Sequence, residues 1–131
     1  MAFESARKIL DTAKELRLTA DAADQRLTEM LQAGYVSDAE FLKMNAQVDK
    51  LYSAVRDLTT HAEDIIISDM DLTQQRLVNT INGAKDEIKK ISDARKLFKV
   101  LASLIGFAAV AMGGQPVAIV GALEGVRKAV A

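Results

Sequence analysis

The sequence predicts an all-α protein: an elongated antiparallel three-helix bundle with a short C-terminal fourth helix that forms a hydrophobic hairpin. Three observations predict this class. Apolar residues recur in steps of three and four along most of the chain. No segment alternates between apolar and polar residues as a half-buried strand would. Helix-start and helix-stop signals divide the pattern of the 131 residues into a few long segments.

The first predicted helix covers about Phe3 to Ala33. Its apolar residues are spaced as in a heptad repeat, which places them on one face of the helix. They are Ala6, Ile9, Ala13, Leu16, Ala20, Ala23, Leu27 and Met30. Gly34 follows, and a glycine is favoured just after a helix because it accepts a positive φ angle.

The second predicted helix covers about Asp38 to Ile67 and begins with a capping box. Ser37 can accept a hydrogen bond from the amide of Glu40, while the Glu40 side chain reaches back to the amide of Ser37. Apolar residues then continue in steps of three and four from Phe41 onward. Because few residues separate the first two helices, we expect them to be antiparallel neighbours.

The third predicted helix begins at a cap, Asp71, and ends before Gly113. A step of three stands where four is due between Ile91 and Ala94, which resembles a stammer that rotates the apolar stripe without ending the helix. A continuous helix of about 41 residues would be about 60 Å long and would extend beyond the second helix by about 15 Å. Pro116 suits the first turn of a fourth helix that reaches about Val130.

Residues Val100 to Leu123 carry no charged side chain, so we divide the chain into a bundle (residues 1–99) and a hydrophobic hairpin that continues the third helix (residues 100–131). The uncharged run is long enough for a membrane span. However, Gly113 and Pro116 divide it into two arms, and each arm is too short to cross a hydrocarbon core about 30 Å thick. The run therefore predicts a helical hairpin.

Three sets of hairpin residues are candidates for function. The apolar set, predicted to enter a membrane or an interface, is Leu101, Leu104, Ile105, Phe107, Val110, Met112, Val117, Ile119, Val120 and Leu123. The small set, predicted to let two helix backbones pack closely, is Ala102, Gly106, Ala109, Gly113, Gly114, Ala118, Gly121 and Gly125. Two cations that precede the uncharged run, Lys96 and Lys99, are predicted to lie near lipid headgroups.

Composition and motifs argue against several function classes. A net charge of −1 argues against nucleic-acid binding. One histidine, His61, and no cysteine leave no ligand set typical of a metal site and no catalytic triad. The Gly113–Pro116 turn is no phosphate loop, because no Lys-Ser/Thr pair follows it. We therefore expect no enzymatic activity, no cofactor and no small-molecule substrate.

A long amphipathic helix leads into an Ala/Gly/Val-rich hairpin with a Gly-Gly-Gln-Pro turn, over Leu97 to Val130. This arrangement resembles the hydrophobic hairpin of α-helical pore-forming toxins, the group that includes cytolysin A and the tripartite enterotoxins of Bacillus. The resemblance implies a hairpin that is hidden in a soluble form and exposed on contact with a membrane.

Two functions remain open from the sequence, and we expect the first of them, with the second as the alternative. The first is a membrane-interacting helical bundle, a toxin-like component whose hairpin inserts into or docks on lipid. The second is a soluble, oligomerising interaction protein, such as an adaptor, a secretion partner or an immunity-type binder, with the hairpin buried as core or interface. The charged N-terminal sequence shows no signal peptide. We therefore expect a cytoplasmic protein or one exported by a leaderless route, associated with membrane if the hairpin binds lipid.

Overall fold

The computed structural model describes residues 2–62 and 74–131, and these residues form five α-helices and no strand. The all-α class predicted from the sequence is confirmed. The helices are α1 (Ala2–Ala33), α2 (Asp38–Thr60), α3 (Gln74–Ile88), α4 (Ala94–Ala111) and α5 (Pro116–Val130).

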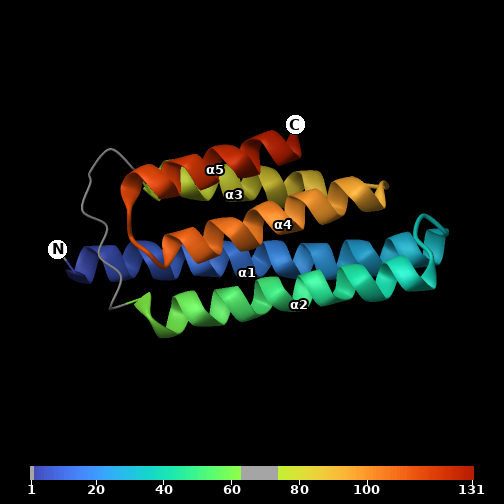
Figure 1. The fold of residues 1–131 in the computed structure, drawn as a ribbon, viewed down its shortest axis with the longest axis horizontal. Coiled ribbons are helices and arrows are strands. Elements are labelled where there is room, and N and C mark those ends of the chain that lie inside the picture. Colours follow the sequence, from blue (N-terminus) through green and yellow to red (C-terminus); the bar gives the residue numbers. More distant parts are fainter. Residues whose placement is uncertain (1, 63–73) are drawn as a thin grey trace.

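Successive helices run in alternating directions along one long axis (Figure 1). α1 packs mainly against α2 and α3, whereas α4 packs mainly against α2 and α5, and α5 also lies along α3. The buried apolar side chains of all five helices form one continuous cluster. The described residues therefore form a five-helix bundle around a single core, in place of the predicted three-plus-one arrangement.

The heptad pattern of the first two helices places their apolar side chains in this core. Leu16, Leu27 and Leu51 are among the most deeply buried residues. The connection between α1 and α2 also follows the sequence signals. Gly34 has a φ angle of +80°. The capping box forms, with the Glu40 amide 3.1 Å from Ser37 Oγ and the Ser37 amide 2.9 Å from Glu40 Oε1.

The second helix is shorter than predicted. α2 ends at Thr60, and the amide of His61 closes its last turn by donating to the carbonyl of Asp57 at 3.0 Å. The rest of the predicted second helix, residues 63–67, lies outside the described residues. The same is true of the predicted cap of the third helix, Asp71.

The prediction of one continuous helix from Asp71 to Met112 is wrong in its central part. α3 ends at Ile88 and α4 begins at Ala94, so the chain reverses direction over residues 89–93 (Figure 1). In the apolar stretch after residue 100, α4 therefore lies along α2 and α5 lies along α3 and α4, so the stretch does not project as a tip beyond the bundle. The stammer at Ile91 marks the reversal, since it is there that the apolar stripe loses its register.

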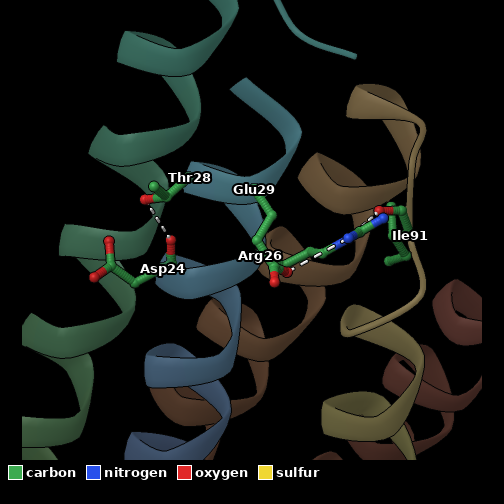
Figure 2. A network of polar contacts seen from close by, with 5 residues as sticks. All are labelled: Asp24, Arg26, Thr28, Glu29 and Ile91. Atoms are coloured by element: carbon green, nitrogen blue, oxygen red, sulfur yellow. Dashed lines mark hydrogen bonds and ion pairs between the residues drawn. The ribbon is translucent and has the colours of Figure 1, made fainter. Parts of the chain in front are cut away.

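Side chains stabilise this reversal (Figure 2). Arg26 of α1 donates from Nε to the carbonyl oxygen of Ile91 at 2.7 Å. Asp93 caps α4 by accepting a hydrogen bond from the amide of Arg95 at 2.9 Å. Lys96 of α4 forms an ion pair with Glu87 of α3 at 3.3 Å. One contact between residues distant in sequence, Arg26 with Ile91, and two contacts within the segment therefore hold the reversal in place of a continuous helix.

The predicted hairpin is an integral part of the core. Residue 100, where the sequence suggested a boundary, lies inside α4, and α4 packs on α2 as well as on α5. Phe107, a central residue of α4, is only 1% exposed. The turn to α5 contains Gly114 with a φ angle of +66°, a conformation that glycine adopts at little cost.

We predict that Phe107→Ala lowers the free energy of unfolding by about 3–5 kcal/mol, because it leaves a large cavity in a core that five helices share. Urea denaturation followed by circular dichroism measures the change. Leu42→Ala is the control, since Leu42 is 69% exposed and its truncation should change stability by less than about 0.5 kcal/mol. Similar, small losses for the two variants would contradict burial of the hairpin.

Candidate functional site

The outer faces of α4 and α5 form the most unusual surface of the described residues. Seven residues make up what we call the small-residue face: Ala102, Gly106 and Ala109 on α4, Gly113 in the turn that follows α4, and Ala118, Gly121 and Gly125 on α5. All seven are exposed. Exposed helix faces in water usually carry charged or polar side chains, and this face carries none.

The sequence predicts that the small residues let the two arms of the hairpin pack closely together. In the structure they do not lie between the two arms. A Cβ atom built on Gly106, Gly121 or Gly125 would meet no atom within 4 Å apart from its own helix backbone. The reason is that larger apolar side chains occupy the core-facing positions and leave the small ones outside. Gly114 is the exception among the eight, since it is buried at the turn.

The ten apolar candidates divide by depth in the core. Five are buried: Leu101, Leu104, Phe107, Ile119 and Leu123. Four are partly buried and pack against the core: Ile105, Val110, Met112 and Val120. Val117, in the first turn of α5, is 85% exposed. Most of the apolar area that was predicted to enter a membrane or an interface is therefore covered by the protein itself.

Basic side chains border the small-residue face at one end of α4. Arg95 and Lys99 are exposed and continue its stripe, at the same spacing of four and three residues. Lys96, the other cation predicted to lie near headgroups, is partly buried in its ion pair with Glu87. Residues 94–131 contain five basic residues and one acidic residue, a net charge of +4. The segment that comprises α4 and α5 is thus basic in a chain whose net charge is −1.

Arg26 contacts the turn that leads into α4, but no local sequence pattern points to this residue. Arg26 belongs to α1, and its side chain reaches the α3–α4 turn. It also forms an ion pair with Glu29 at 3.4 Å (Figure 2). Arg26 and Ile91 are 65 positions apart in the sequence, which explains why no local pattern reveals their contact. The stammer between Ile91 and Ala94 is the local sequence feature that coincides with the reversal of the chain.

A second polar feature lies in a groove of about 500 Å³ between α1 and α2. The hydroxyl of Tyr52 donates a hydrogen bond to Asp21 Oδ1. Burial raises the pKa of the Tyr52 hydroxyl well above its ordinary value, and the hydrogen bond and charge of Asp21 raise it further. Tyr52 therefore keeps its proton and links α1 to α2.

Within residues 2–62 and 74–131, no helix is both long enough and apolar enough to cross a membrane. The same residues contain no group of three or more His, Cys, Asp or Glu side chains that could hold a metal ion. Comparison of the chain with protein-family models, with curated proteins and with solved structures finds no significant match. The geometry of the chain itself is therefore the basis for a proposal.

We predict that Gly121→Ala raises the free energy of unfolding of the isolated chain by about 0.5–1 kcal/mol. Alanine is favoured over glycine in an exposed helix interior, and the added methyl group meets no neighbour. Urea denaturation at low protein concentration measures the change. Gly114→Ala is the control and should be destabilising because of its positive φ angle. Destabilisation by Gly121→Ala would mean that the fold itself needs this glycine.

Proposed function

We propose that this chain is a self-associating helical interaction protein, in which the α4 part of the small-residue face packs against the same part of a second copy. The observation that carries the proposal is the set of exposed helical glycines that serve no packing role within the chain. This corresponds to the interaction protein that the sequence left open, with the hairpin serving as both core and interface.

The energetic argument starts from the cost of glycine in a helix. Each of Gly106, Gly121 and Gly125 makes its helix less stable by about 1 kcal/mol than alanine would. Nothing in the described structure offsets that cost, because the space beside each Cα is open. A second helix that approaches the backbone closely would offset it, since close approach increases dispersion contacts along both helices.

A second copy suits this face because close approach requires small residues on both helices. The α4 stripe of Ala102, Gly106 and Ala109 repeats every four and three residues, the spacing at which two helices pack side by side. A two-fold axis would pair the stripe with itself, as in most homodimers. The Gly and Ala residues of the two copies then face each other, with no large side chain between the two backbones.

The charges favour an antiparallel pair. Arg95 and Lys99 lie at only one end of the stripe, so an antiparallel arrangement places the cations of the two copies at opposite ends. Lys99 and Ala109, at opposite ends of the helical part of the stripe, are 10 residues apart, or about 15 Å along a helix. That separation exceeds the Debye length of about 8 Å at physiological salt, so repulsion between the cations is largely screened.

Insertion of the hairpin into a bilayer receives less support from this geometry. It would require α4 and α5 to leave the core that they share with α1, α2 and α3. The surface already exposed consists mainly of Ala and Gly, which offer little apolar area to lipid. Lipid binding is therefore treated as an alternative outcome of the experiment below.

We predict that the unmodified chain dimerises and that Ala109→Leu weakens the dimer at least tenfold, because the larger side chain separates the two backbones. Sedimentation equilibrium over a range of concentrations measures the dissociation constant. Ala46→Leu is the matched control, since Ala46 is an exposed alanine on α2, away from the face. It should leave association unchanged.

Three results would contradict the proposal. The first is an unmodified chain that stays monomeric up to millimolar concentration. The second is an equal effect of the Ala109→Leu and Ala46→Leu variants. The third is flotation of the chain with vesicles of mixed neutral and anionic lipid that Ala109→Leu abolishes, in the absence of any dimer. That result would assign the same face to lipid.

A further inference from the structure

The turn between α3 and α4 differs from the other two described turns in its sequence. The α1–α2 turn contains Gly34 and the α4–α5 turn contains Gly114, both with positive φ angles. The α3–α4 turn reads Lys-Lys-Ile-Ser-Asp over residues 89–93, with no glycine and no proline. Its residues can all enter a helix, so the local sequence does not require the chain to reverse there.

Two hydrogen bonds in this turn replace one helical hydrogen bond. In a continuous helix the carbonyl of Ile91 would accept from the amide of Arg95, four residues later. In the structure Arg26 Nε donates to that carbonyl at 2.7 Å (Figure 2), and Asp93 Oδ1 accepts from that amide at 2.9 Å. Without both side chains, the carbonyl and the amide would each lack a partner in the turn, and a continuous helix would pair them.

We infer that α3 and α4 can join into one continuous helix and that two copies then exchange their α4–α5 hairpins. A joined helix carries α4 away from its own α2, and α5 away from its own α3. The large buried side chains of the hairpin, Leu104 and Phe107 among them, would then be exposed to water. A second copy whose own hairpin has also left offers the same complementary surface, so each hairpin refills the core of the other copy.

This exchange is separate from the packing of small-residue faces proposed above. It uses the core-facing side of α4, whereas the proposed dimer uses the outer side. Ala109→Leu should therefore weaken the face-to-face dimer and leave exchange unaffected. Exchange is measured in that background, so that failure of either proposal can be told apart from failure of the other.

The test removes both side chains that stabilise the turn, with Arg26→Met and Asp93→Ala combined in the Ala109→Leu background. Met keeps most of the aliphatic length of Arg26 but cannot donate the hydrogen bond. After refolding at high concentration, we expect at least tenfold more dimer than in the Ala109→Leu background alone. Adding Ser92→Pro should return the chain to a monomer, since proline inside a joined helix is strongly unfavourable. Sedimentation velocity measures the two populations.

A distance measurement identifies the joined helix directly. The chain has no cysteine, so spin labels can be placed at Gln75→Cys in α3 and Lys99→Cys in α4, which are both exposed. In a joined helix the two positions are 24 residues apart, or about 36 Å along the axis. In the folded-back chain they are much closer, because α4 returns along the bundle. Dilution of labelled chains into an excess of unlabelled chains before refolding isolates distances within one chain.

The expected result is a dimer with the long distance in the triple variant, and a monomer with the short distance after Ser92→Pro is added. A triple variant that folds, stays monomeric and keeps the short distance would overturn the inference. So would a dimer that keeps the short distance. If circular dichroism shows that the triple variant is unfolded, Arg26→Met and Asp93→Ala are tested one at a time. Folded single variants with no increase in dimer would overturn it equally.

Discussion

The rest of the architecture depends on the reversal of the chain at Ile91 and on the hydrogen bonds that hold it. Arg26 of α1 donates to the Ile91 carbonyl, and Asp93 caps the helix that follows. Because the chain turns back here, α4 lies along α2, and the large apolar side chains of the hairpin complete the core. The same turn determines which side of α4 remains outside, so it also creates the small-residue face.

The distribution of residue sizes along α4 and α5 explains how one uncharged segment can serve two purposes. Large side chains such as Leu101, Leu104 and Phe107 fill the core, while the exposed side carries small residues such as Ala102, Gly106 and Ala109. An uncharged run of this kind is ambiguous when only its composition is considered. Its helical phase resolves the ambiguity, since the large residues and the small residues lie on different faces of each helix.

Local sequence patterns predicted the helices well where the signals were local. The heptad spacing of α1, the capping box at Ser37 and the glycine stop at Gly34 all appear in the structure. The reversal at residues 89–93 could not be predicted in the same way, because it depends on Arg26, which is 65 residues distant in sequence. The exposure of Gly106 and Gly121 could not be predicted either. It depends on which side of each helix faces the core, and that is known only once the chain reverses and α4 lies on α2.

The most direct test of the proposed function is a symmetric disulfide crosslink across the face of α4. The chain has no cysteine, so Gly106→Cys and Ala109→Cys, made one at a time, each place a single thiol near the middle of the stripe. Under mild oxidation we predict rapid formation of a covalent dimer by at least one of them, with slow formation by the Ala46→Cys control on α2. Equal, slow rates for all three variants would contradict packing of a second copy on this face.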